Sequence, residues 1–562
     1  MPSKSRRGQT RNVTGGMAIV EALITNGVDT VFGLPGAQLY ALFDALHQRR
    51  QQIRTVGARH EQACGYMAFG YARSTGRPAV YAVVPGPGLL NTSAALATAL
   101  GCNAPVLCIT GQVPAAFIDR GRGHLHELPD QLATLRSLTK WAARIERPAE
   151  APAVINEAFR QMLAGRPGPV AVEMAWDSMA AAEAVTPLPA AAMPPPPQAS
   201  AAAVEAAAKL LLAAERPMIM TGSGAQHAGA AVAALAEDLT APVAAFRGGR
   251  GAVPEDHELA ISSYAAFRLW PQTDALLGIG TRLELPYMRW TGMMRLINRP
   301  SPPPHLIRID IDPAEMRRLQ PHTAIVADAD AGTRALLAAI RAQGSRASPS
   351  EVRPAWRTRI ADAKLAARAE IEKVQPQLAY LDVIRELLPR NGFFVGELSQ
   401  VGFTSYFGFP VLAPRGYVSE GYQGTLGFGF PTALGVKIAN PERVVISVTG
   451  DGGFMFAVQE LATAVQERIG LITVLFNNGA YGNVLRDQRT NFANRLNGAV
   501  LDNPDFMLLA KAFGVAGHRV DSPQALRPVL RQALADKDPQ LIEVVVAQGS
   551  EVSPWEFIHP QR

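Results

Sequence analysis

Cysteine is scarce in this sequence of 562 residues. The three cysteines are Cys64, Cys102 and Cys108, and they show neither CxxC spacing nor a neighbouring histidine cluster. An odd number of cysteines in this arrangement argues against a disulfide scaffold and against a zinc site. We therefore expect a protein of a reducing, cytoplasmic compartment.

The sequence also lacks an excess of charge of one sign. It contains 54 Lys and Arg against 48 Asp and Glu, and several of the positive charges lie in the first dozen residues. Because no basic stripe recurs further along the chain, nucleic-acid binding is not expected. The basic start leads through Gly15 and Gly16 into an ordinary helical pattern, so it does not resemble a secretory signal.

Residues 78–118 contain no charged side chain. Pro85, Pro87 and Pro105 interrupt this stretch too often for a membrane-spanning helix, so no membrane association is expected. We interpret it as core strands and one helix buried inside a large α/β domain.

Hydrophobic residues make up 48% of the chain and charged residues 18%, which is typical of a protein with a large core. Proline-rich or polar stretches at about 179–200 and 343–354 are predicted linkers. They separate three predicted domains, at residues 12–178, 199–342 and 355–548. In each domain short β-branched runs alternate with helical patterns, which predicts an α/β fold with three doubly wound parallel sheets. The predicted strands include residues 79–84, 106–110, 218–221, 306–311, 444–449 and 471–476.

Residues 444–481 carry the most informative pattern. A predicted strand ends in Gly450-Asp451-Gly452-Gly453, a helix is expected at about 457–467, and a second strand ends in Asn477-Asn478. Because a βαβ crossover places both loops at the same sheet edge, Asp451 and Asn478 can converge. Carboxylate and amide oxygens suit Mg²⁺, and glycine N–H groups can cradle a phosphate. Either motif alone would more often be a simple turn.

Together the two motifs resemble the diphosphate-binding motif of thiamine-diphosphate (ThDP) enzymes. The resemblance implies that Mg²⁺ is bound by Asp451, by the side chain of Asn478 and by the main-chain oxygen of Ala480. It also implies that the cofactor contacts Gly450, Gly452, Gly453, Tyr481 and Gly482.

Residues 53–76 read as a strand followed by a helix, with Glu61 near the first helical turn. A glutamate there commonly interacts with the helix dipole. However, the sequence from Arg59 to Ala63 is similar to the family's activating-glutamate motif. The resemblance implies that Glu61 faces N1′ of the aminopyrimidine ring and activates the cofactor.

Other loops resemble the acetolactate synthase branch of this family. The resemblance implies that Gly36, Gly86 and Gln400 contact the cofactor, and that the Gly424 carbonyl and the Leu426 side chain hold its bent shape. It also implies that Gln38, Gln112 and His126 face the substrate. For each glycine loop a simple turn is an alternative, and for His124 and His126 a solvated loop is an equally good one.

Three departures separate this chain from acetolactate synthases. Asp487 stands where they have a tryptophan that limits the acceptor pocket, and residues 280–286 lack their acceptor-binding arginine. Ser262 and Ser263 lie where they have a flavin-binding turn, so FAD is doubtful.

Residues 222–224 form a lone Gly-x-Gly after a strand and before a helix, which we interpret as helix–sheet packing.

The resemblance implies an enzyme that decarboxylates a 2-oxo acid and then releases an aldehyde or transfers the acyl unit. It also implies a homodimer or homotetramer, since the family builds its site between subunits. Two alternatives stay open: a ThDP-dependent lyase acting on a 2-hydroxyacyl thioester or a diketone, and a catalytically silent regulatory paralogue.

Overall fold

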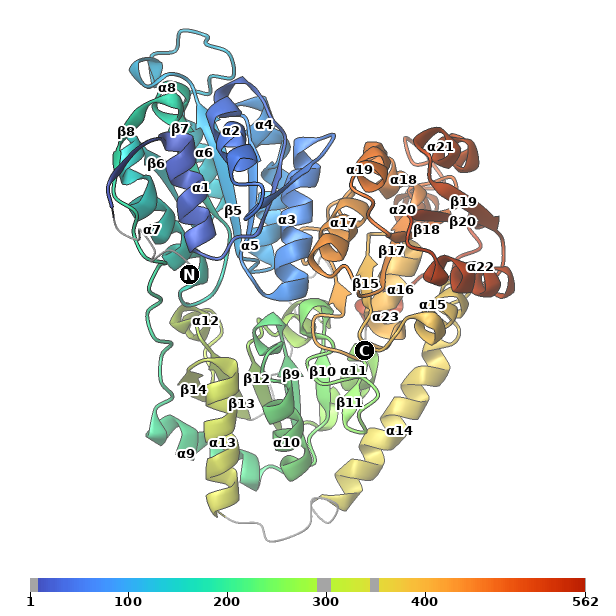
Figure 1. Cartoon of the computed structure of the whole chain (residues 1–562). Helices are drawn as coiled ribbons and strands as arrows, with labels where there is room; N and C mark the ends of the chain where they lie inside the picture. The colour runs from blue at the N-terminus through green and yellow to red at the C-terminus, as the bar shows by residue number, and fades with distance from the viewer. Residues whose placement is uncertain (1–8, 291–304, 344–352, 561–562) are drawn as a thin grey trace, which may run out of the picture. The chain divides into compact units, whose positions relative to one another are not determined.

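The computed structural model describes residues 9–290, 305–343 and 353–560. Within them it contains three six-stranded parallel sheets flanked by helices (Figure 1), which confirms the predicted α/β class. Most of the predicted linker at 343–354 lies outside the described residues. Two compact units are distinguished: residues up to Pro195 with 420–441 and 456–470 form the first, and the other described residues form the second.

The first sheet has the strand order β3-β2-β4-β5-β7-β6. The predicted core strands are present as β4 and β5, but the uncharged stretch between them forms two helices, α4 and α5, and not the single helix expected. Two short outer strands, β1 (Arg11–Thr14) and β8 (Ala182–Val185), pair antiparallel. The six strands are β2 (Thr30–Gly33), β3 (Arg54–Gly57), β4 (Ala79–Val83), β5 (Val106–Gln112), β6 (Trp141–Ile145) and β7 (Val170–Ala175).

Among the described residues, eight α-helices accompany this first sheet, and those at residues 15–25, 40–48, 151–163 and 176–180 share one buried apolar core with its strands. They are α1 (Gly15–Thr25), α2 (Tyr40–Gln48), α3 (Glu61–Thr75), α4 (Pro87–Asn91), α5 (Ser93–Gly101), α6 (Gln131–Leu138), α7 (Ala151–Leu163) and α8 (Trp176–Ala180). A further helix of the same unit, α17 (Gly429–Ala439), lies directly against α3. A Cβ on Gly70 would come within 2.1 Å of the Thr432 carbonyl oxygen, and one on Gly435 within 2.0 Å of the Met67 carbonyl oxygen. The two glycines therefore let the helix backbones touch.

The second unit contains the middle sheet, ordered β11-β10-β9-β12-β13-β14. Its strands are β9 (Pro217–Thr221), β10 (Val243–Ala245), β11 (Ala260–Ile261), β12 (Ala275–Ile279), β13 (His305–Asp310) and β14 (Thr323–Val326). The sheet is flanked by α9 (Ala201–Ala213), α10 (Gly229–Leu239), α11 (Ser263–Leu269), α12 (Pro313–Arg318) and α13 (Ala329–Gln343). Their packed faces form part of a large apolar core.

The third sheet has the order β16-β15-β17-β18-β20-β19. Its strands are β15 (Phe393–Gly396), β16 (Tyr417–Val418), β17 (Val445–Gly450), β18 (Ile472–Asn477), β19 (Ala516–Val520) and β20 (Gln540–Val545). The helix predicted at 457–467 is divided into a 3₁₀ turn at Val458–Glu460 and α19 (Leu461–Gln466). The remaining helices are α14 (Pro354–Ile371), α15 (Gln377–Leu387), α16 (Gln400–Gly408), α18 (Asp451–Phe454), α20 (Gly482–Asn491), α21 (Phe506–Phe513), α22 (Pro523–Ala535) and α23 (Trp555–Ile558). In the described part of the chain, none of the helices is both long enough and apolar enough to span a bilayer.

Candidate active site

The two halves of the diphosphate motif meet at one edge of the third sheet. Strands β17 and β18 are parallel neighbours in which Gly450 pairs with Phe476, so the loops that follow them start side by side. Asn503 links these loops, because its Nδ2 donates both to Asp451 Oδ2 (2.7 Å) and to Asn477 Oδ1 (3.0 Å). No sequence motif predicted this role for Asn503.

Asp451 is a buried carboxylate with 2% of its surface exposed. Burial raises its pKa above the ordinary value, although hydrogen bonds from Asn503 and from the backbone N–H groups of Gly452, Gly479 and Ala480 act in the opposite direction. An ionised carboxylate in such surroundings is stabilised by a nearby cation. A divalent cation beside Asp451 would therefore offset part of the cost of burying this charge.

Oxygen atoms dominate this candidate metal site. Among the residues that the structure describes, no group of three or more His, Cys, Asp or Glu side chains could hold a metal. A metal beside Asp451 would therefore complete its shell with amide and backbone carbonyl oxygens, such as those of Asn478 and Ala480. That mixture suits Mg²⁺ and does not suit zinc.

Asn478 is held by two hydrogen bonds. Its Nδ2 donates to Glu551 Oε2 (2.6 Å), and its Oδ1 accepts from the backbone N–H of Ala480 (3.1 Å). Burial raises the pKa of Glu551, while the hydrogen bond from Asn478 and the charge of Arg486 act to lower it. No motif indicated Glu551, which follows β20 in a different part of the sequence.

The glycines of the motif are required by close packing. A Cβ on Gly452 would lie 2.5 Å from the Tyr481 ring, and one on Gly453 would lie 2.7 Å from the Glu397 carboxylate. A Cβ on Gly482 would lie 2.9 Å from Asn478 Nδ2. Larger residues would therefore displace the side chains that shape this edge.

Gln400 and Asp487 both lie close to the first turn of α20. Arg486, on this helix, donates to Gln400 Oε1 and to Ser553 Oγ, the latter at 3.1 Å. Asp487 accepts a long hydrogen bond (3.5 Å) from Asn483. Asn483 and Arg486 are therefore polar neighbours of Asp487 on α20.

Glu61 is the first residue of α3, as predicted from the sequence. Its Oε2 accepts a hydrogen bond from Asn91 Nδ2 (3.0 Å), and its Oε1 lies near Gly88, where an added Cβ would be 3.6 Å away. The first turn of α3 therefore presents this carboxylate toward α4. Within the residues that the structure describes, its Oε1 accepts no hydrogen bond, so this oxygen can face a ligand.

Glu460 supports the turn that carries Glu61. This fully buried side chain accepts from the Arg59 backbone N–H with both carboxylate oxygens (3.1 Å each) and from Thr463 Oγ1 (2.6 Å). Burial raises its pKa, and these hydrogen bonds lower it in part. Glu460 belongs to the family-like segment VQELATAV, but the sequence offered no signal of what it touches.

Gln38, Gly86 and His126 are brought together in the first unit. Gln38 is buried, its Nε2 donates to the Leu125 carbonyl (3.1 Å), and its Oε1 pairs with His126 Nδ1 (3.2 Å). Gly86 has a positive φ of 61°, and a Cβ there would lie 2.5 Å from the His126 carbonyl oxygen. His124 instead lies over the Phe117 ring, with centroids 4.3 Å apart.

Gln112 ends β5 and is buried, but its Oε1 accepts from the neighbouring Val113 N–H (2.8 Å). Gln131, which sequence reasoning missed, connects the surrounding loops, since its Nε2 donates to the Gly111 carbonyl and its Oε1 accepts from Gly86 N–H. Gly36 packs against Val84, where a Cβ would approach within 2.4 Å. These contacts form a rigid rim at the carboxyl ends of β2, β4 and β5.

Residues 423–428 form a loop with positive φ values at Gly424 (62°) and Gly427 (76°). A Cβ on Gly427 would lie 2.5 Å from Phe456 Cβ. The Gly424 backbone is exposed and Leu426 is half-buried, so both are accessible to a ligand.

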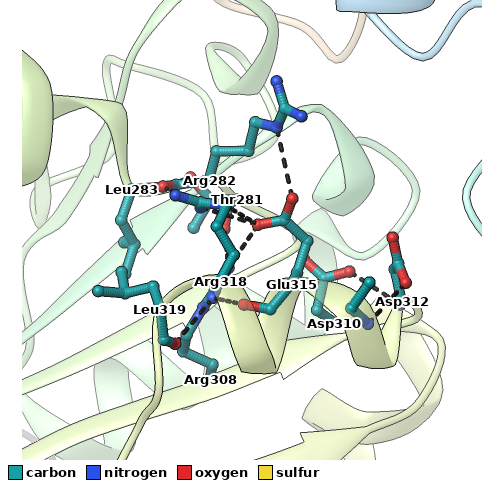
Figure 2. Close-up of polar contacts among 10 residues, drawn as sticks. Thr281, Arg282, Leu283, Arg308, Asp310, Asp312, Glu315, Arg318 and Leu319 are labelled. Carbon is teal, nitrogen blue, oxygen red and sulfur yellow. Dashed lines mark hydrogen bonds and ion pairs between the residues drawn. The ribbon is translucent and has the colours of Figure 1, made fainter.

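An ion network occupies the carboxyl edge of β12 and β13 in the middle sheet (Figure 2). Arg308 is 1% exposed and donates to the carbonyl oxygens of Glu315 (2.6 Å) and Thr281 (2.8 Å). The Glu315 carboxylate faces three guanidinium groups, those of Arg282, Arg308 and Arg318.

The Gly-x-Gly segment at residues 222–224 does not open an α-helix, although the sequence pattern suggests one. It forms a 3₁₀ turn at Ser223–Ala225, and α10 begins only at Gly229. A Cβ on Gly222 would lie 2.2 Å from the Gly280 carbonyl oxygen, so these glycines pack the loops after β9 and β12 against each other. The expectation of helix–sheet packing is therefore wrong in detail.

Comparison with known families identifies the class. Residues 13–134, 204–336 and 398–544 match, in turn, the N-terminal TPP binding domain, the central domain and the C-terminal TPP binding domain of the thiamine pyrophosphate enzymes. The chain belongs to this family, in its acetolactate synthase-like group of decarboxylases and carboligases.

Several named proteins are similar to the chain over nearly its whole length. A probable 2-ketoarginine decarboxylase of Pseudomonas aeruginosa is 34% identical, covering 95% of this chain and 94% of the relative. A probable acetolactate synthase large subunit of Methanocaldococcus jannaschii is 33% identical (95% and 92%). The acetolactate synthase isozyme 1 large subunit of Escherichia coli is 30% identical (99% and 98%).

Proposed function

We propose that this protein is a ThDP- and Mg²⁺-dependent enzyme that decarboxylates a 2-oxo acid and then releases an aldehyde or transfers the acyl unit to an acceptor. The observation that carries the proposal is the buried Asp451 carboxylate beside the Asn477-Asn478 turn, in a chain with Glu61 at the start of α3. We do not propose a strict biosynthetic acetolactate synthase. Asp487 stands where those enzymes have a tryptophan that limits the acceptor pocket, so the contact with the acceptor must differ.

The residues divide into two groups by role. Asp451, Asn478 and the Ala480 carbonyl hold Mg²⁺, and the N–H groups of the Gly450–Gly453 turn, with Tyr481, Gly482 and Gln400, surround the diphosphate. Glu61, Gly36, Gly86, Gly424 and Leu426 contact the aminopyrimidine and thiazolium end. When bound, ThDP would supply a nucleophilic carbon and an electron sink for decarboxylation of the substrate.

The chain itself supplies proton handling and orientation. Glu61 holds a proton against N1′ of the aminopyrimidine, and Asn91 keeps one carboxylate oxygen in place for this task. Gln38 and His126 form one hydrogen-bonded pair, and with Gln112 they orient the substrate. FAD is not part of this proposal, because Ser262 and Ser263 lie where the acetolactate synthases have a flavin-binding turn.

The test is CO₂ release from a panel of 2-oxo acids by protein reconstituted with ThDP and Mg²⁺, with products identified. The panel includes pyruvate, and 2-ketoarginine because of the named relative. We expect one acid to react only when ThDP is present, and Glu61→Gln to lose most of the rate, about 100-fold or more. Glu556→Gln, which changes an exposed glutamate, is the matched control. ThDP binding without reaction of any 2-oxo acid would contradict the proposal.

We further propose a homodimer or homotetramer in the cytoplasm. Leu90, Tyr422 and Phe456 are large apolar side chains with 44%, 47% and 52% of their surfaces exposed, and they neighbour the segments that carry Asn91, Gly424 and Gly427. Burying such a surface against a second copy is favourable. Sedimentation equilibrium should give two or four times the 60.0 kDa chain mass. A monomer at micromolar concentration would contradict this assembly.

A further inference from the structure

The two asparagines at the carboxyl end of β18, Asn477 and Asn478, are held in the same way. Asn477 Nδ2 donates to Glu543 Oε1 (2.8 Å), and its Oδ1 accepts from Gly479 N–H (3.2 Å). Asn478 Nδ2 donates to Glu551 Oε2 (2.6 Å), and its Oδ1 accepts from Ala480 N–H (3.1 Å). In both pairs a glutamate oxygen accepts from the amide nitrogen, so the amide oxygen is directed away from the glutamate.

The side-chain amide oxygens of Asn477 and Asn478 differ in the number of hydrogen bonds that they accept. Asn477 Oδ1 accepts a second hydrogen bond, from Asn503 (3.0 Å). In the described part of the chain, Asn478 Oδ1 accepts only from Ala480 N–H, and a carbonyl oxygen has two lone pairs. The same Ala480 N–H also interacts with the Asp451 carboxylate, so this oxygen and that carboxylate share one neighbourhood.

Glu551 is itself fixed by the backbone on both sides. The Val552 N–H donates to the Gln375 carbonyl (3.1 Å), and the Val552 carbonyl accepts from Gln377 Nε2 (2.6 Å). On the other side, Ser550 donates from its N–H (3.1 Å) and from its Oγ (2.8 Å) to the Ala547 carbonyl. The backbone that carries Glu551 is therefore held in place by hydrogen bonds on both sides of this residue.

We propose that Glu551 is a positioning residue for the divalent cation. Its carboxylate fixes the Asn478 amide so that the oxygen, and not the nitrogen, is directed to the metal beside Asp451. The inference rests on the proposed function, because it assumes a metal at Asp451 and Asn478. Residues that orient a metal ligand commonly change metal affinity by about 10- to 100-fold when they are replaced.

The first test compares two replacements of Glu551 in the full-length protein. We measure the Mg²⁺ concentration needed for half-maximal ThDP binding, followed by tryptophan fluorescence. Glu551→Leu removes the acceptor and should raise this concentration about 10- to 100-fold. Glu551→Gln keeps an acceptor oxygen and should raise it less. Equal losses in the two variants, or no loss in either, would overturn the proposal.

The second test is a reciprocal rescue. Asn478→Asp places a carboxylate opposite Glu551, and the repulsion should weaken Mg²⁺-dependent binding of ThDP. Combining it with Glu551→Gln restores a donor facing an acceptor, so the double variant should bind Mg²⁺ at least about tenfold more tightly than Asn478→Asp. A double variant no better than the single one would overturn the proposal, even if Glu551→Leu fails to fold.

Controls separate this inference from the proposed function. Glu556→Gln, five residues further along the same segment and exposed, should leave the Mg²⁺ requirement unchanged. Asp451→Ala should abolish Mg²⁺-dependent ThDP binding. If Asp451→Ala has no effect, the metal site itself is wrong; if it has the expected effect while the Glu551 variants match the original protein, only the positioning role fails.

Discussion

At the scale of single residues, His559 shows how hydrogen bonds select one protonation state. Its Nε2 accepts from Arg289 Nη1 (2.9 Å), and its Nδ1 faces the Arg289 carbonyl oxygen (3.3 Å), which requires the neutral ring protonated on Nδ1. Burial and the positive charge of Arg289 lower its pKa to about 4. The folded protein therefore keeps this ring neutral at pH values where an unfolded chain would protonate it.

This difference predicts a pH dependence of stability. The contribution of His559 is fully present above the ordinary histidine pKa of about 6.5 and is lost as the pH falls toward about 4. His559→Gln retains a group that can accept from Arg289 but cannot titrate. Its Tm should fall less steeply than that of the original protein between pH 7 and 5. The pH slopes of the two free energies of unfolding should differ by at most about 1 kcal/mol per pH unit after solvent screening.

Parallel thermal melts of the two proteins across this range provide the measurement. Gly168→Ala, which changes no titratable group and meets only ordinary contacts of 3.6 Å, is the control and should leave the slope unchanged. Identical pH slopes for His559→Gln and the original protein would show that the ring is not held neutral.

At the scale of elements, the Arg308–Glu315 pair joins β13 to α12. The two side chains are 1% and 5% exposed, and Glu315 also pairs with Arg318 at 2.8 Å. Removing the Glu315 side chain leaves the buried Arg308 guanidinium without its paired carboxylate, although its hydrogen bonds to backbone carbonyl oxygens remain. Glu315→Ala should therefore cost about 3 kcal/mol of unfolding free energy. Glu205→Ala, which breaks the exposed pair with Lys209, should leave the free energy of unfolding essentially unchanged.

Urea unfolding of the two alanine variants measures this contrast. Both replace a glutamate on a helix of the middle domain and differ chiefly in burial, so similar losses for the two would contradict the account of the network.

The close contact between α3 and α17 leads to a second prediction about stability at this scale. An added methyl group on Gly435 would meet the Met67 backbone at 2.0 Å, so Gly435→Ala should force the helices apart and cost about 1–3 kcal/mol. Gly168→Ala meets only ordinary contacts of 3.6 Å and serves as the matched control. Because α3 begins at Glu61, we expect Gly435→Ala to lower activity as well, measured beside its melting temperature. An unchanged Tm would show that the helices tolerate the methyl group.

At the scale of the whole molecule, sequence patterns predicted the three parallel sheets. Apolar runs such as residues 218–221 and 471–476 lie in buried parallel strands, because strands covered on both faces must be continuously apolar. The positions of Glu61 and Asp451 followed from local motifs at strand ends. Their supporting residues could not be predicted, because Glu460 lies 401 positions from Arg59, and Glu551 lies 73 positions from Asn478. Such contacts depend on tertiary packing that no short motif encodes.

The most direct test of the central claim is the exchange of the C2 proton of bound ThDP for deuterium, followed by NMR after rapid acid quench. The account predicts fast exchange in the original protein with Mg²⁺. It also predicts exchange slowed about 100-fold or more in Glu61→Gln, with ThDP still bound. Equal exchange rates in the two proteins would contradict the assignment of Glu61 as the activating residue, and failure of the original protein to bind ThDP would contradict the proposed function as a whole.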